Sequence, residues 1–226
     1  MSDDSQKQNR TELLRKIKDE ILNGKHLPLY PERIKNKVYP VIGEGSHYAK
    51  IMFVGEAPGK NEAETGRPFC GASGRVLDEL LVSVEIPRND VYVTNIVKDR
   101  PPMNRDPFPD EIEAYASYLD RQIEIIQPQV IATLGRFSMA YIMNRLGLSS
   151  QPRRQGVGAP TSDASVGAGG ASGLDSISKI HGRVFEAKTS YGTVKIVPLY
   201  HPAVAVYNGN MKNELKKDFE VLKQFK

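Results

Sequence analysis

Residues 51–84, IMFVGEAPGKNEAETGRPFCGASGRVLDELLVSV, join a short apolar run to an amphipathic segment through a long polar loop. The run Ile51–Val54 is apolar throughout, which is typical of a strand buried on both faces of a sheet. Ser73 is a candidate N-cap, and apolar side chains follow it at helical spacing as far as Val84. A strand, a loop and a helix in this order form one unit of an α/β fold.

The same unit recurs along the chain. Further strands are expected over residues 91–97 and 130–134, and the helices that follow them over residues 109–126 and 136–146. The remaining expected elements are a first helix closed by Gly24, a hairpin over residues 182–199 that turns at Tyr191-Gly192, and a last helix that ends near Phe225. We therefore predict an α/β fold, a three-layer α/β/α sandwich with a central, mainly parallel four-stranded sheet.

The domain organisation is expected to be simple. A chain of 226 residues is long enough for one domain with a sizeable core, so residues 1–226 are predicted to form a single domain. One segment, at about residues 149–176, is rich in Gly, Ser and Ala and has almost no large apolar side chain. Ordering it would cost backbone entropy without burying apolar surface, so we predict a flexible insertion there.

Composition excludes several classes of protein. The net charge of +4 only weakly favours a polyanionic partner. Since no apolar run approaches the ~18 residues that a membrane-spanning helix needs, and the polar start resembles no secretory signal, we expect a cytoplasmic protein that does not enter a membrane. Cys70 is the only cysteine, which excludes an internal disulfide, a four-thiolate zinc site and an iron–sulfur cluster held by the chain's own cysteines.

Four loops are predicted to meet at one edge of the sheet, because ligands of such folds bind beyond the carboxyl ends of the parallel strands. Each loop begins with a chemically capable group. These groups are Glu56, Asn95, Gly135-Arg136 and His201.

Four segments also carry a resemblance to a known family. GEAPGKNEAETGRPFCGASG, TNIVKDRPPMNRDPFPDEI, QPQVIATLGRFSM and YHPAVAVYNG resemble the successive motifs of the family 4 uracil-DNA glycosylases, in the same order and spacing. The resemblance extends from about the first helix to the C-terminus, apart from the insertion. It implies a monofunctional enzyme that hydrolyses the N-glycosidic bond of uracil in DNA and leaves an abasic site.

The chemistry of this reaction matches particular residues. The sugar develops oxocarbenium character while uracil leaves as an anion, so a carboxylate near C1′ and donors to the uracil oxygens are needed. Glu56 is the expected carboxylate, either to activate water or to balance the positive charge, and His201 is suited to donate to uracil O2. Asn95 can accept from N3–H and donate to O4, a pattern that cytosine reverses.

Further contacts to the extruded base are expected in the loop after the first strand. Phe69 offers an aromatic face for stacking, with a core position as the alternative reading. The resemblance adds five uracil-binding positions from the same loop: Gly55, Ala57, Pro58, Gly59 and Glu62. For Glu56 and Glu62 the alternative is a structural loop carboxylate, and for Asn95 it is a strand-end amide.

Two groups of residues are predicted to contact DNA itself. Lys98, Arg100 and Arg105 lie after the second strand and could bind phosphates, with a solvated charged loop as the alternative. After His201, an apolar wedge that props open the duplex is predicted from Val204, Val206 and Tyr207.

The resemblance fails at the metal. Most members of the family hold a [4Fe-4S] cluster through four cysteines, and the matching positions here are Leu27, Tyr30, Asp99 and approximately Tyr115. We therefore predict that no iron–sulfur cluster, metal or other cofactor is bound, and that apolar and aromatic packing of Leu27, Tyr30 and Tyr115 replaces the cluster.

The prediction from sequence is thus a DNA repair glycosylase that flips uracil out of single- or double-stranded DNA and works as a monomer. Two alternatives stay open. One is a glycosylase for hypoxanthine or another deaminated base, and the other is a DNA-binding relative without catalytic activity.

Overall fold

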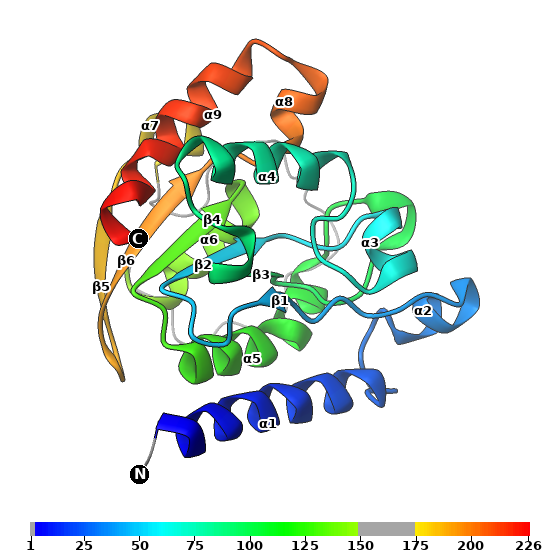
Figure 1. Ribbon diagram of the computed structural model, residues 1–226. Helices are drawn as coiled ribbons and strands as arrows, with labels where there is room; N and C mark the ends of the chain where they lie inside the picture. The colour runs from blue at the N-terminus through cyan, green and yellow to red at the C-terminus, as the bar shows by residue number, and fades with distance from the viewer. Residues whose placement is uncertain (1–2, 149–174) are drawn as a thin grey trace.

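The computed structural model describes residues 3–148 and 175–226 (Figure 1). The predicted insertion at residues 149–176 lies outside the described residues, apart from its last two positions. Within the described parts of the chain, no helix is long and apolar enough to cross a membrane.

One mixed sheet organises the described residues. Its strands are β1 (Glu44–Gly45), β2 (Ile51–Gly55), β3 (Tyr92–Asn95), β4 (Val130–Leu134), β5 (Phe185–Thr189) and β6 (Gly192–Leu199), in the spatial order β1-β3-β2-β4-β6-β5. The four inner strands are parallel to one another, and the edge strands β1 and β5 pair antiparallel to β3 and β6.

The mainly parallel sheet is confirmed, but the prediction of four strands was wrong. The two additional strands are the edges. β1 has two residues, too few to produce a periodic pattern in the sequence, and the predicted hairpin contributes both of its strands, so that β5 extends the sheet beyond β6. The four parallel strands of the prediction are the inner four of the observed six.

The helices enclose the sheet. They are α1 (Asp3–Leu22), α2 (Tyr30–Asn36), α3 (Lys60–Thr65), α4 (Ala72–Ser83), α5 (Pro109–Ile126), α6 (Arg136–Arg145), α7 (Ile177–Ile180), α8 (Ala203–Tyr207) and α9 (Met211–Phe219). Short 3-10 turns are found at Arg88–Asp90, Pro102–Asn104 and Glu220–Phe225.

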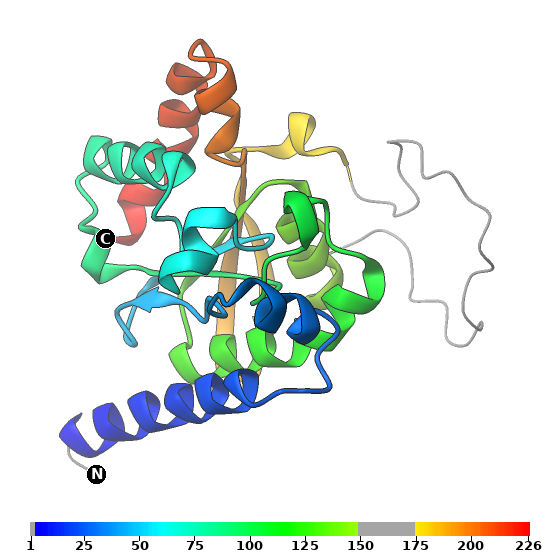
Figure 2. The ribbon, with the colours of Figure 1, turned by 90° about the vertical axis from the view of Figure 1, so that its right-hand side faces the viewer.

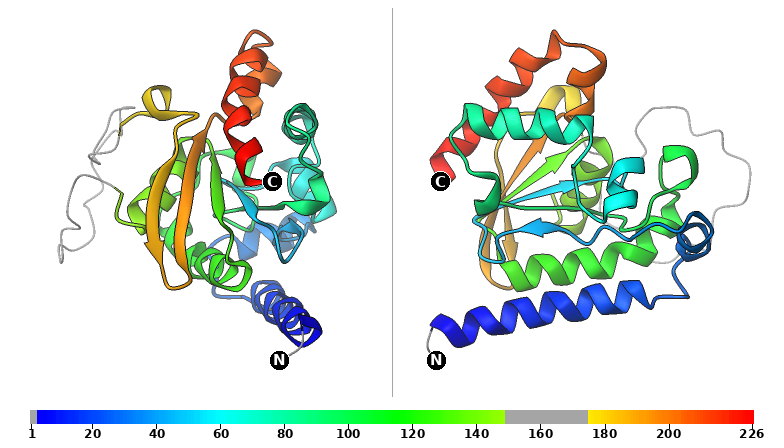
Figure 3. Two further views of the ribbon diagram at one scale, coloured as in Figure 1. Left: turned by 60° about the vertical axis from the view of Figure 1, so that its left-hand side comes forward. Right: turned by 45° about the vertical axis from the view of Figure 1, so that its right-hand side comes forward.

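Both faces of the inner strands are buried, as an α/β/α sandwich requires. In β2 successive side chains alternate between two apolar clusters: Met52 and Val54 pack with α1, α5 and α6, whereas Ile51 and Phe53 pack with α4 and α9. The helices accordingly lie on two opposite sides of the sheet in Figure 3, and α1 lies alongside α5 on the outer side of that layer (Figure 2).

Short helices account for most differences from the sequence prediction. α2, α3 and α8 have seven, six and five residues, and segments this short carry little periodicity. The expectation that Ser73 caps α4 was wrong, because Gly71 occupies the N-cap and the helix begins one residue before Ser73. α3 occupies part of what the sequence suggested was one long loop.

A buried ion pair holds together α1, α2, α5 and the loop after β3. Arg33 Nη1 donates to both carboxylate oxygens of Asp99 at 3.2 Å, and its Nη2 donates to the carbonyls of Ile21 and Leu22 at the end of α1. Tyr115 on α5 donates to Asp99 at 2.6 Å. We call Arg33, Asp99 and Tyr115 the buried staple.

The buried staple lies within the packing that the sequence predicted. Leu27 and Tyr115 are buried as predicted, and Tyr30 lies over the Arg33 guanidinium with 4.8 Å between the ring centre and Cζ. The Arg33–Asp99–Tyr115 contacts add a polar connection that the sequence did not predict. Arg33 was not singled out from the sequence because an arginine gives no sign of burial until its partner is known.

Candidate functional site

A cleft of about 470 Å³ opens at the carboxyl edge of the parallel strands. Its walls are formed by the loop after β2, the end of β3, the loop after β3 and the start of α8. The lining residues predicted from the sequence are Glu56, Ala57, Pro58, Gly59, Glu62, Phe69, Asn95, Arg105, His201 and Tyr207. The structure therefore brings into one cavity the three polar groups that the sequence placed after β2, at the end of β3 and after β6.

Strand register places Glu56 beside Asn95. Gly55 pairs with Asn95 across the parallel strands β2 and β3, so the residue that follows Gly55 comes next to the end of β3. A Cβ on Gly55 would lie 2.3 Å from the Asn95 side-chain oxygen and 2.9 Å from the Phe69 ring. Glycine is thus required here for the amide and the aromatic ring to approach the main chain closely.

Phe69 occupies a left-handed backbone conformation with φ of 51°. This region is unfavourable for a bulky residue, and such strain is found most often at functional sites. The loop is held by Glu62, whose Oε1 accepts a hydrogen bond from the Gly71 amide at 2.9 Å. The Phe69 ring is 8% exposed and lies 5.6 Å from the His201 ring, between centroids. The side chain therefore belongs to the core and also lines the cleft, and its stacking on a base stays a prediction.

His201 is held as a neutral donor. Its Nδ1 accepts a hydrogen bond from the Ala203 amide at 3.2 Å, which requires the ring proton to be on Nε2. Burial lowers the pKa of His201 to about 4, and the nearby Glu62 carboxylate only partly opposes this. The ring stays neutral near pH 7 and presents N–H to a partner. Gly135, with φ of 97°, lets the chain pass His201, because a Cβ there would be 3.3 Å from the His201 Cβ.

Glu56 has a strongly altered acidity. Burial and, to a smaller extent, the Asp106 carboxylate raise the pKa of its carboxyl while Arg136 lowers it, and the net result is a pKa of about 7. Asp106 and Arg136 are themselves paired at 2.9 Å. A carboxyl group whose pKa lies near neutrality, in a cleft, has the property of a general base or of a group that responds to substrate charge.

Lys98 corrects the prediction of a phosphate contact. Its side chain is 0% exposed, and its Nζ donates to Thr94, Asn95 and Gln122 inside the protein. Lys98 is thus unable to reach a DNA backbone in this structure. The sequence pattern indicated a charged, exposed loop. Lys98 instead folds back to the end of β3, where its Nζ bonds to the Asn95 carbonyl.

The two arginines of the same loop lie closer to the surface. Arg105 lines the cleft, where it pairs with Glu111 and stacks on Phe108 at 3.7 Å from the ring centre. Arg100 is half-buried and donates to the Asn104 side chain at 2.6 Å. Arg100 is thus bonded within the loop, and Arg105 connects the loop to the start of α5.

The predicted wedge divides into two parts. Val204 is half-buried against the core, whereas Val206 and Tyr207 are exposed at 43% and 89%. Tyr207 also lines the cleft. Of the three, Tyr207 has the position and the exposure of a side chain that can enter a neighbouring molecule.

Several lining residues were missed from the sequence. They are Ser73, Pro101, Asn104, Asp106 and Ala203. Asp106 is the most important of them because it acts on the acidity of Glu56. Its place in the loop after β3, next to the predicted Arg105, was a usable signal, but the sequence could not show that this loop folds back over the residue that follows β2.

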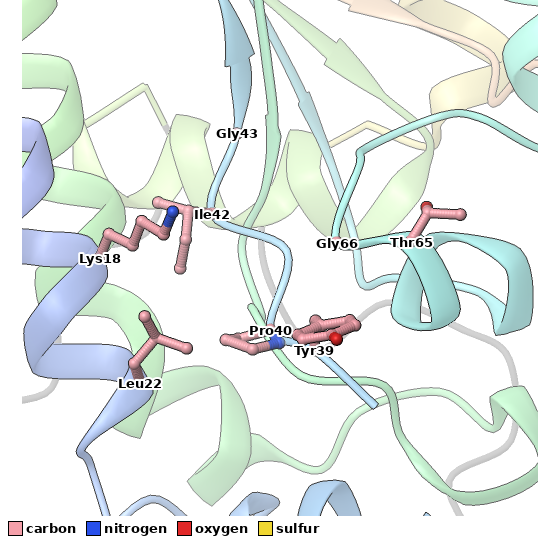
Figure 4. Close-up of a pocket in the computed structure, with 8 residues that line it drawn as sticks. All are labelled: Lys18, Leu22, Tyr39, Pro40, Ile42, Gly43, Thr65 and Gly66. Carbon is pink, nitrogen blue, oxygen red and sulfur yellow. The ribbon is translucent and has the colours of Figure 1, made fainter. Parts of the chain in front are cut away.

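A second hollow, of about 250 Å³, lies between α1, residues 39–43 and the end of α3 (Figure 4). Lys18 and Leu22 of α1 face Tyr39, Pro40 and Ile42 across it. Its lining includes no carboxylate or imidazole group. This smaller hollow therefore lacks the acid–base groups that the cleft at the carboxyl edge contains.

The four positions that the sequence analysis matched to cluster cysteines hold no thiol group. A leucine, a tyrosine, an aspartate and a second tyrosine occupy them, and the aspartate and Tyr115 are joined in the buried staple. No thiolate is available among them. The one cysteine of the chain, Cys70, lies instead in the loop that follows α3.

Comparison with known proteins agrees with the geometry of the cleft. Residues 42–223 match the sequence model of the uracil DNA glycosylase superfamily. The chain is 40% identical over 212 residues to a type-4 uracil-DNA glycosylase of Sulfurisphaera tokodaii, and the matched stretch covers 93% of this chain and 84% of that protein. It is 39% identical to the protein so named from Archaeoglobus fulgidus, over 82% of this chain and 81% of the relative, and 34% identical to that of Thermotoga maritima, over 96% of each.

Proposed function

The chain belongs to the uracil DNA glycosylase superfamily, and we propose that it hydrolyses the N-glycosidic bond of uracil in DNA and leaves an abasic site. One observation carries the proposal. Glu56, Asn95 and His201, from three separate segments, line a single cleft together with the aromatic ring of Phe69. A flipped pyrimidine needs an edge reader, a donor to the departing oxygen, a stacking surface and a carboxylate near C1′.

Recognition of the base is assigned to Asn95, Phe69 and His201. The Asn95 amide pairs with N3–H and O4 of uracil, and the wrong base would leave this buried amide unpaired. The fixed Phe69 ring stacks on the base. The Nε2–H of His201 donates to O2, where negative charge develops as the bond breaks. Gly55, Ala57, Pro58, Gly59 and Glu62 complete the binding loop.

Hydrolysis is assigned to Glu56. As the bond between C1′ and N1 lengthens, the sugar gains positive charge and the electron pair stays with uracil. The Glu56 carboxylate offsets the sugar charge and accepts a proton from the water that attacks C1′. Both tasks require the ionised form of Glu56.

The DNA strand is proposed to be held at the rim of the cleft. Tyr207 and Val206 form the wedge that fills the space left by the flipped nucleotide, while Arg100 and Arg105 contribute positive charge near the phosphates. Lys98 is excluded from this group because it is buried.

Oligonucleotides that carry uracil, hypoxanthine or thymine at one position test the proposal. After incubation with the protein, alkali should break only the uracil strand, and no breakage should occur without alkali because the enzyme is monofunctional. Breakage at hypoxanthine would favour the purine alternative. Binding without breakage would favour the DNA-binding alternative. Glu56→Gln serves as the control for a contaminating activity from the expression host.

We also propose that the protein holds no iron–sulfur cluster and acts in the cytoplasm as a one-domain monomer. The buried staple supports the first part, since it already connects the elements around the corresponding positions. Purified protein should be colourless and free of iron, and it should elute as a single copy in size-exclusion chromatography with light scattering. Stoichiometric iron would contradict the proposal.

A further inference from the structure

Lys98 is buried directly beneath the end of β3. Its Nζ donates to the Thr94 hydroxyl at 2.7 Å, to the Asn95 main-chain carbonyl at 2.7 Å and to the Gln122 side-chain oxygen at 2.6 Å. None of these partners is charged. The proposed reaction assigns nothing to this side chain, yet it contacts the main chain of the residue that reads the base.

The three partners indicate the charge of Lys98. The Thr94 hydroxyl gives its proton to the Ile42 carbonyl at 2.7 Å, and Gln122 directs its amide nitrogen to the same carbonyl at 2.9 Å. The oxygen atoms that face Nζ are therefore left to accept, and three acceptors require the three protons of an ammonium group. Burial lowers the pKa of Lys98 well below its usual range. The three short hydrogen bonds act in the opposite direction, because acceptors around Nζ favour its charged form.

The position of this cation matters because the Asn95 side chain lines the cleft. A charge in the protein interior is weakly screened, so it acts more strongly on a neighbouring cavity than a surface charge would. Arg100 is paired with Asn104 of its own loop, and Arg105 with Glu111 of α5. Lys98 is instead held next to Asn95 by its three hydrogen bonds, the same bonds that favour its charged form.

We propose that Lys98 is a positioning residue for uracil release: its buried ammonium fixes the main chain at Asn95 and supplies positive charge next to the base as it departs. The inference rests on the proposed function. When the bond between C1′ and N1 breaks, the electron pair remains on N1 and uracil leaves as an anion. A fixed positive charge nearby stabilises that anion in the transition state without any rearrangement.

Two substrates with different leaving groups test the inference. The fluorine of 5-fluorouracil makes the departing anion more stable, so its release depends less on positive charge from the protein. Lys98→Met should lower the single-turnover rate on uracil by at least about tenfold and the rate on 5-fluorouracil by much less. Thr94→Ser is the matched control, because it removes a buried methyl group from the same network but keeps the hydroxyl that accepts from Nζ, so that all three acceptors of the ammonium remain. In this control variant the ratio of the rate on uracil to the rate on 5-fluorouracil should equal the ratio in the unchanged protein.

The outcomes separate the possible failures. If the unchanged protein released neither base, the proposed function would fail and this inference with it. If the unchanged protein were active and Lys98→Met lowered both rates equally, or neither, the inference alone would be overturned. Should Lys98→Met fail to fold, nitrogen-15 NMR of the lysine side chains in the unchanged protein decides: a buried, slowly exchanging ammonium signal at pH 7 is expected, and a neutral amine would overturn the inference.

Discussion

Two groups of polar side chains, which come within four residues of each other in the sequence only at Asn95 and Asp99, are organised in opposite ways. In the buried staple, Asp99 accepts hydrogen bonds from Arg33 and Tyr115, and Arg33 uses its remaining donors on the end of α1. In the cleft, Glu56 and Asn95 are directed into a cavity that is large enough for a pyrimidine. The staple is complete in itself, whereas the cleft groups await a partner.

The difference distinguishes a structural site from a functional one. A buried polar group with its hydrogen bonds formed costs little, and removal of one partner leaves the other without compensation. A buried group without partners costs stability in the free protein and regains it when a ligand supplies the partners. The pKa of Glu56, raised to about 7 mainly by burial, is the measurable sign of this second condition.

The largest expected effect is on catalysis at Glu56. Glu56→Gln keeps the shape of the side chain but removes the carboxylate, so the single-turnover rate on uracil should fall by about 10³-fold or more. Glu64→Gln, on the exposed side of α3, is the matched control and should keep the full rate. A Glu56→Gln protein as fast as the unchanged one would show that the cleft carboxylate has no part in the reaction.

The next effect is on stability at the staple. Arg33→Met fills the same space without charge and leaves Asp99 buried and unpaired, so the free energy of unfolding in urea should fall by about 3 kcal/mol. Arg15→Met removes an exposed ion pair with Glu12 on α1 and should change it by less than about 0.5 kcal/mol. If both changes lowered the free energy of unfolding equally, the burial of the Arg33–Asp99 pair would not make it more important for stability than the exposed Arg15–Glu12 pair.

The sequence predicted those regions that depend on residues close together in the chain, and it missed those that depend on distant ones. β2, β4 and α5 were predicted because apolar spacing is a local property, and the cleft was predicted because parallel strands necessarily end at one edge. The buried staple was not. Its arginine, carboxylate and phenol are 66 and 16 residues apart in the chain, and nothing local marks such residues as partners.

Lys98 and Asp106 show the same limit within the site. Both belong to the segment after β3, where the sequence indicated charges for DNA. The direction of each side chain depends on how that segment folds over its neighbours. Lys98 is buried, and Asp106 lies close enough to Glu56 to raise its pKa. The chemical types were visible in the sequence, but their partners were not.

The free energy of unfolding should fall by about 1–2 kcal/mol as the pH rises and Glu56 ionises in its partly buried position. Glu56 has a pKa of about 7 in the folded protein against 4.5 ordinarily, so the folded state holds this proton more tightly. The resulting stability is fully present below pH 4.5 and is lost as the pH rises to 7. Glu56→Gln should therefore be more stable than the unchanged protein at pH 8, and the gap should close at pH 4.5, as measured by urea unfolding at both values. A gap that did not change with pH would contradict the raised pKa.

Activity should follow the opposite trend. Because the reaction uses ionised Glu56, kcat/KM should rise as the pH increases through about 7. Asp106→Asn removes a negative charge and frees Arg136, and both changes favour the carboxylate, so the rise should move to lower pH by about one unit or less. Asp110→Asn, an exposed position at the start of α5, should leave the profile in place. A shift to higher pH in Asp106→Asn would mean that Asp106 does not act on Glu56 through its charge.

The smallest effect is expected at the rim, where a side chain is neither buried nor paired. Tyr207 is 89% exposed and lines the cleft, so the free protein gains little from it. Tyr207→Ala should leave the free energy of unfolding nearly unchanged and lower the single-turnover rate on uracil in a duplex by about fivefold, with a smaller loss on a single strand that needs no wedge. Tyr39→Ala, an exposed tyrosine beside the second hollow, should affect neither substrate. An equal loss on both substrates at Tyr207 would place this residue at the base itself rather than in the gap the base leaves.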